Sequence, residues 1–116
     1  MEATRAASNR QEEYIAKKFG GRQTCNSGAG HWVKGDVVIK DASLLVECKT
    51  VMSEKKSVSV QKEWIEKNSK EAKENHLYNS CIAISFDPSG KENYYIIDEK
   101  LFSFLVENLK NYMENS

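Results

Sequence analysis

The chain has 116 residues, 29% of them charged and 40% hydrophobic, and its formal net charge is zero. A chain of this size folds as one domain with a modest core, so we take residues 1–116 as a single domain. No apolar run approaches the ~20 residues of a membrane span, and no apolar signal core stands near the N-terminus. The three cysteines form no CxxC pair, so we expect free thiols in a reducing cytoplasm.

Charge is unevenly distributed along the chain. Basic residues outnumber acidic ones in the first third, and acidic residues outnumber basic ones in the last third. A dedicated nucleic-acid binder is often basic overall, so the zero net charge counts against that class. A basic N-terminal half is nevertheless compatible with contacts to phosphate groups.

Residues 8–19 are predicted to form the first helix, which Ser8 or Asn9 caps and Gly20-Gly21 ends. Its apolar stripe consists of Ile15, Ala16 and Phe19.

Glu12 lies over the same stripe, because it precedes Ile15 by three residues and Phe19 by seven. Such a carboxylate either reaches a functional site, directly or through water, or merely caps the helix. Glu13 lies further toward solvent and is the weaker candidate for the same role.

The segment from Arg22 to Trp32 is predicted to be a polar loop containing Asn26-Ser27-Gly28-Ala29-Gly30. It lacks both the Walker and the GxGxxG pattern, so we expect no nucleotide-phosphate loop. The residues expected to touch a DNA backbone here are Arg22, Ser27, His31 and Lys34, and the alternative is a plain connecting loop. Neither histidine has ligand-like spacing to the cysteines, so zinc is not expected.

Two short aliphatic runs, Val37–Ile39 and Leu44–Val46, predict a β-hairpin joined by residues 40–43. A turn symmetric about Asp41-Ala42 places Asp36 opposite Glu47 on one sheet face. Lys49 points to the same face, because it lies two residues beyond Glu47. Two acids and one amine therefore meet at one edge of the sheet.

Two opposed carboxylates repel each other, and a divalent cation would turn that repulsion into attraction. Mg²⁺ is usually held by one or two carboxylates, several waters and a substrate phosphate. An ordinary hairpin with solvated charged ends has the same spacing, however. A register shift of one residue would also move Asp36 to the other face.

In the second half, Thr50–Ser57 is predicted to be a polar connection carrying Lys55 and Lys56, and residues 58–75 a helix. Gln61 and Lys62 open that helix near the hairpin, where they either orient water or phosphate or form a solvated first turn. The packed stripe is expected to include Val60, Trp64, Ile65, Asn68 and Ala72.

Residues 80–86 and 93–97 are predicted strands joined by a turn at Asp87–Gly90, and a last helix starts at Asp98 or Glu99. The apolar stripe of that helix is expected to be core, or a dimer surface if it is too wide for one small domain.

The chain resembles the PD-(D/E)xK nuclease superfamily. Lys34-Gly35-Asp36-Val37, Val46-Glu47-Cys48-Lys49 and the glycine loop are most similar to archaeal-type and phage-encoded Holliday junction resolvases, although Gly35 stands where the family has proline. The resemblance implies an α/β, restriction-endonuclease-like core in which helices flank a mixed sheet, in the order α-β-β-(loop)-α-β-β-α. It implies a bacterial, archaeal or phage-infected host cell.

The resemblance implies Asp36 and Glu47 as metal ligands, Lys49 as the catalytic lysine, Glu12 as the helix acid and Ser27 as a DNA contact. We therefore expect hydrolysis of a DNA phosphodiester with Mg²⁺ or Mn²⁺. The main-chain carbonyl of Val46 or Cys48 is a further expected ligand.

Four-way junctions are the expected substrate, and two symmetric cuts predict a C₂ homodimer. The alternatives are a nicking, repair or restriction-type endonuclease of the same fold, a non-catalytic binding module, and a structural subunit of a larger complex.

Overall fold

The computed structural model describes residues 2–24 and 36–116. The elements in this part of the chain are α1 (Glu2–Phe19), β1 (Arg22–Gln23), β2 (Asp36–Ile39), η1 (a 3₁₀ turn, Lys40–Ala42), β3 (Leu44–Lys49), α2 (Lys62–Glu74), β4 (Asn79–Ser85), β5 (Asn93–Ile97) and α3 (Glu99–Glu114). The predicted DNA contacts Ser27, His31 and Lys34 lie outside the described residues.

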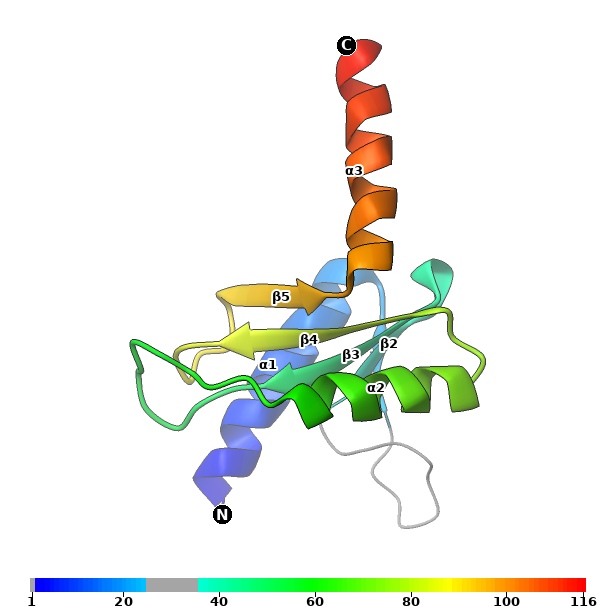
Figure 1. Cartoon of the computed structure of the whole chain (residues 1–116). Helices are drawn as coiled ribbons and strands as arrows, with labels where there is room; N and C mark the ends of the chain where they lie inside the picture. Colours follow the sequence, from blue (N-terminus) through cyan, green and yellow to red (C-terminus); the bar gives the residue numbers. More distant parts are fainter. Residues whose placement is uncertain (1, 25–35) are drawn as a thin grey trace.

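The described strands form one mixed sheet in the order β1-β2-β3-β4-β5 (Figure 1). Strands β3 and β4 are parallel, and α2 makes the crossover between them, whereas the other neighbouring pairs are antiparallel. This confirms the predicted fold class, an α/β protein in which helices flank a mixed sheet. The short strand β1 was not predicted, because two residues are too few to show a strand pattern.

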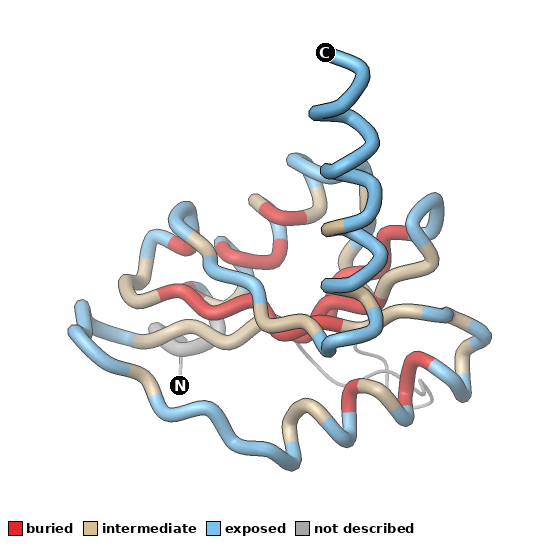
Figure 2. Tube along the Cα trace, turned by 45° about the horizontal axis from the view of Figure 1, so that its top comes forward, coloured by how far each residue is buried: buried red, intermediate tan, exposed pale blue. Residues whose placement is uncertain are grey.

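Helices α1 and α2 cover opposite faces of the sheet (Figure 1). On the α1 face, Ile15 packs with Val37, Val46 and other strand residues in the main buried cluster. On the α2 face, Ala72 packs with Val38 and Leu45. Neighbouring strand residues belong to different layers because side chains alternate across a strand. The buried residues lie in the sheet and on the sheet-facing sides of α1 and α2, whereas α3 has none (Figure 2).

The predicted start of the first helix is wrong, because α1 begins at Glu2 and Ser8 and Asn9 lie inside it. Residues 2–7 include three alanines, and Ala is the strongest helix former, so the helix continues upstream of the expected cap. The predicted end is confirmed: Gly20 has a φ of 68°, and the Gly21 amide donates to the Ala16 carbonyl at 2.8 Å.

The second helix also begins elsewhere, at Lys62 rather than at residue 58. Two β-branched residues, Val58 and Val60, alternate with serines here, and both residue types are weak helix formers. Val60 is exposed and does not join the packed stripe. Asn68 and Ala72 are buried as expected, while Trp64 and Ile65 are half-buried.

Helix α3 begins where predicted, since the Asp98 carboxylate accepts a hydrogen bond from the Leu101 amide at 2.8 Å. The helix projects away from the sheet (Figure 1). All of its residues are described, and none of them is buried, so the expectation that its apolar stripe is core is wrong. Within the described residues, no helix is long and apolar enough to cross a membrane.

Candidate active site at the sheet edge

The hairpin has the predicted register. Asp36 pairs with Glu47, and Val37, Val38 and Ile39 pair with Val46, Leu45 and Leu44. The Asp36 and Glu47 side chains therefore lie on the same face of the sheet, the α2 face. Asp36 is fully buried, and Glu47 is only 4% exposed. The alternative of a hairpin with solvated charged ends is therefore wrong, because both carboxyl groups are removed from water.

Lys49 completes the predicted group of three. The group lies at the end of the sheet where β2 begins and β3 ends, and this end of the strands is called the sheet edge below. The Lys49 Nζ lies 3.1 Å from Glu47 Oε2 and 4.3 Å from the centroid of the Trp64 ring. A cation over the face of an indole is held electrostatically, and Trp64 comes from the first turn of α2. The ammonium group is thus held between a β3 carboxylate and an α2 ring, while about a third of the side chain stays exposed.

One carboxylate oxygen of Glu47 could still bind a cation. Its Oε1 atom is buried and accepts no hydrogen bond from the part of the chain that the structure describes. A buried carboxylate oxygen without a donor is costly. The position is therefore one where a cation or a proton would be favourable.

Glu71 of α2 is a further acid close to Glu47. Burial, followed by the negative charge of Glu47, raises the pKa of the Glu71 carboxyl, while Lys67 opposes the shift. The sequence analysis did not single out Glu71. Its signal was its place beside Asn68 and Ala72 on the packed stripe of the helix.

Glu12 is buried as predicted, whereas Glu13 is exposed. The Glu12 carboxylate accepts a hydrogen bond from Gln23 Nε2 at 3.2 Å. Gln23 pairs with Val37, whose side chain lies in the α1 layer, so Glu12 approaches the edge from the opposite face to Glu47. The capping role is wrong, because Glu12 lies in the middle of α1.

The Cys48 thiol lies within electrostatic reach of three carboxylates. Its pKa is raised mainly by burial, then by Glu12, Asp36, the Cys81 thiol and Glu47. These acids thus converge on one region of the sheet. Among the described residues, no group of three or more His, Cys, Asp or Glu side chains is arranged to hold a metal. The carboxylate pair is therefore the protein ligand set to be considered first, and a water-mediated role for Glu12 stays a prediction.

Gln11 is a fully buried polar residue that the sequence analysis passed over. Its Nε2 lies within hydrogen-bond distance of the Lys49 carbonyl at 3.0 Å, the Ala83 carbonyl at 3.3 Å and Asn93 Oδ1 at 2.9 Å. It thereby ties α1 to three strands beside Lys49. The sequence signal was the spacing of Ala7, Gln11 and Ile15, which lie four residues apart and therefore on one face of the helix. In the structure all three are buried.

The remaining predicted DNA contacts are exposed. Gln61 and Lys62 lie one turn before Trp64 at the start of α2. The Lys55 amide donates to the Phe86 carbonyl at 2.9 Å, just beyond the end of β4, and Lys56 follows it. Since β3 and β4 are parallel, that end is also the Lys49 end of β3. Arg22 instead lies on the edge strand β1, opposite Val38.

Comparison with protein-family models, curated proteins and solved structures found no match to this chain.

Proposed function

We propose that the chain is a divalent-metal-dependent DNA endonuclease that resolves four-way junctions. The observation that carries the proposal is the buried pair Asp36 and Glu47, with the Lys49 ammonium 3.1 Å from Glu47. Buried acids beside a held lysine at a sheet edge are costly to folding, and such arrangements mark functional sites. The motif resemblance supplies the reaction class.

The donor set fits Mg²⁺ or Mn²⁺. Both prefer oxygen ligands, and Glu47 Oε1 is buried without a hydrogen-bond donor among the described residues. Asp36 and Glu47 would hold the ion, the Cys48 main-chain carbonyl would add an oxygen, and Glu12 would act through water. When bound, the ion supplies Lewis-acid polarisation of the phosphate and acidifies water.

The work of the chain's own residues begins with Lys49. Its ammonium can donate to both a water and a phosphate oxygen, which orients the nucleophile and stabilises charge that develops during attack. Glu47 and Trp64 restrict where that ammonium lies, so less ordering is needed when substrate binds. Gln11 keeps the Lys49 main chain in place from the opposite face.

DNA binding is assigned to exposed side chains around this edge. Lys55, Lys56, Gln61 and Lys62 stand near the Lys49 end of the sheet, while Ser27, His31 and Lys34 precede Asp36 in the chain and Arg22 lies on β1. Contacts to phosphates position a duplex without reading its sequence, which suits recognition of a branched structure. One site cuts one strand, so resolution of a junction requires a symmetric dimer.

The test is cleavage of a synthetic four-way junction with Mg²⁺. We expect Asp36→Asn and Lys49→Ala each to lower the rate by at least about a hundredfold, because each removes a group that acts on the reacting centre. The matched control is Asp41→Asn, which neutralises an exposed carboxylate at the turn of the same hairpin. Wild-type rates in Asp36→Asn, with circular dichroism unchanged, would refute the assignment.

Two further measurements separate the alternatives. Cleavage of four-way, flap and linear duplexes in one assay distinguishes a resolvase from a repair or restriction-type enzyme. Calorimetry with Mn²⁺ distinguishes a nuclease from a non-catalytic module, which would be folded but would neither bind the ion nor cleave.

A further inference from the structure

Helix α3 exposes a broad apolar surface. At 100° per residue, its apolar side chains cover more than half of the circumference, and Glu107, Lys110 and Glu114 gather on the remaining side. Six large apolar side chains are each 48–69% exposed, namely Phe102, Phe104, Leu105, Leu109, Tyr112 and Met113.

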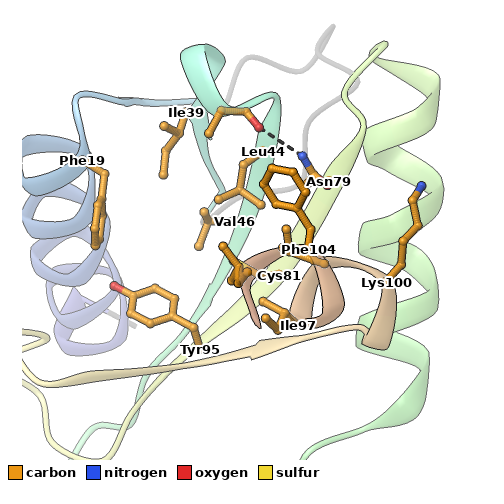
Figure 3. A pocket seen from close by; sticks show the side chains of 13 residues that line it. Phe19, Ile39, Leu44, Val46, Asn79, Cys81, Tyr95, Ile97, Lys100 and Phe104 are labelled. Carbon is orange, nitrogen blue, oxygen red and sulfur yellow. Dashed lines mark hydrogen bonds between the residues drawn. The ribbon is translucent and has the colours of Figure 1, made fainter. Parts of the chain in front are cut away.

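An apolar groove lies at the foot of this helix, on the α1 face of the sheet (Figure 3). It has a volume of about 710 Å³. Val46, Cys81 and Ile97 form its floor, while Phe19 and Tyr95, in edge-on contact at 6.0 Å between ring centroids, close one side. Leu101, Phe104 and Leu105 of α3 line the other side.

The outer half of α3 takes no part in the groove of its own chain. Leu109, Tyr112 and Met113 lie beyond the groove-lining turns, and α3 leads away from the sheet to the C-terminus (Figure 1). The molecule therefore carries both an open apolar groove and a projecting apolar helix end on one continuous surface.

We infer that a second copy of this chain occupies the groove: the outer half of each α3 packs into the groove of the other copy. Such an interface is isologous, since Leu109 of each copy meets the same residues of its partner. The chain has zero net charge, and Glu107, Lys110 and Glu114 face away from the apolar row, so these charges do not oppose self-association. Lys100 is the charged residue among those that line the groove.

The exposed area matches what a dimer needs. Aromatic side chains each offer roughly 150–250 Å², so six large apolar side chains of about this size at about 60% exposure present on the order of 550–900 Å². Patches of this size exceed those of most monomers, and a standard interface buries about 800 Å² per partner. The inference deepens the proposed function, from which the expectation of paired sites comes, but neither the surface nor its test involves DNA.

The first experiment is analytical ultracentrifugation of the full chain over a range of concentrations. We expect a mass of twice 13.2 kDa for the wild type and the single-chain mass for Leu109→Glu. Ser103→Glu is the matched control, because it adds the same charge to the polar side of the same helix and should leave the dimer intact. A wild-type monomer, including one whose groove binds a hydrophobic dye, would overturn the inference.

The second experiment locates the contact independently of variant folding. A photo-crosslinking amino acid in place of Tyr112 is activated in a mixture of isotopically heavy and light chains. Heavy-to-light crosslinks to the groove, at Leu44–Val46 or Tyr95–Ile97, support the inference. Heavy-to-light crosslinks confined to α3, or crosslinks only within one chain, would overturn it.

Failure here is distinguishable from failure of the nuclease proposal. A monomeric protein with metal-dependent nicking would refute the interface and the symmetric dimer, while the metal-dependent nuclease chemistry would stand. A dimer without metal-dependent cleavage would refute the nuclease proposal alone.

Discussion

The sheet edge and helix α3 depart from the usual distribution of side chains in opposite ways. At the edge, Asp36, Glu47 and Glu12 are acidic and buried, whereas α3 is largely apolar and exposed. Acidic side chains are rarely buried, and large apolar patches are rarely left in water. We expect the buried acids of the edge to lower the stability of the domain that carries them and to depend on support from their surroundings. Helix α3 contributes little to the domain and is suited to an external partner.

Two buried side-chain amides, one from α2 and one from α1, hold the strands next to the edge. Asn68 donates to the Cys81 carbonyl at 2.9 Å on the α2 face, while Gln11 binds main-chain carbonyls from the α1 face. Both donate hydrogen bonds to main-chain carbonyl groups of the strands near the charged site. The hydrogen bonds of helix α3 are local: its own backbone bonds, the Asp98 cap and the bonds that the Asn108 and Asn115 amides donate to the carbonyls of Phe104 and Asn111.

The largest expected effect contrasts these two regions directly. Gln11→Ala should lower the free energy of unfolding by about 3 kcal/mol, because it opens a cavity and removes the buried hydrogen bonds that Gln11 donates to the strands. Phe102→Ala removes a larger side chain, yet should change it by less than about 0.5 kcal/mol because Phe102 is exposed. Urea denaturation of dilute, monomeric protein measures both. Equal losses of unfolding free energy in the two variants would contradict the view that the edge depends on its supporting contacts while α3 contributes little to the domain.

A substitution at Gly90 tests how tightly the chain packs against Gln11, which supports the edge. A Cβ at Gly90 would lie 2.6 Å from Gln11 Cα, and its φ is 68°. Gly90→Ala should therefore cost about 2 kcal/mol or more. Gly20 has the same φ with nothing within 4 Å, so Gly20→Ala should cost only about 1 kcal/mol, the backbone part alone. Thermal unfolding compares the two, and similar costs would show that the contact with Gln11 relaxes easily.

Trp64 tests whether the edge positions its lysine. Trp64→Leu should slow junction cleavage by about fivefold while preserving the fold, because a cation–π contact of this kind contributes about 1 kcal/mol. Trp64→Phe keeps an aromatic face and should restore most of the rate. If the Trp64→Leu and Trp64→Phe variants cleaved at the same rate in single-turnover kinetics, the ring would contribute through packing alone.

The smallest expected effect concerns Glu71. A raised pKa means that the folded state disfavours the ionised carboxyl, so stability falls as pH rises through and above the ordinary carboxyl value of about 4.3. Glu71→Gln should thus stabilise the protein at neutral pH by less than about 1 kcal/mol, and the gain should disappear below about pH 4. Denaturation in the presence of a chelator at both pH values measures this. A gain that persisted in acid would point to packing instead of charge.

Part of the candidate site was predictable from local pattern. Two aliphatic runs separated by four residues allow few pairings, so the register that opposes Asp36 and Glu47 followed from the hydrophobic pattern. The same alternation placed Lys49 on their face. Trp64, Glu71 and Gln11 were not singled out, because their roles depend on helices brought onto the sheet from distant parts of the chain.

The amino-acid sequence by itself determined the order of the elements apart from β1, the hairpin register and the shared face of Asp36, Glu47 and Lys49, since these follow from patterns within a few residues. Only the tertiary structure decided which face of the sheet each helix covers. It thereby decided that Glu12 approaches from the α1 side, that Trp64 and Glu71 flank Lys49 and Glu47, and that α3 projects with its apolar row uncovered. Those outcomes depend on how distant surfaces pack, which no local pattern contains.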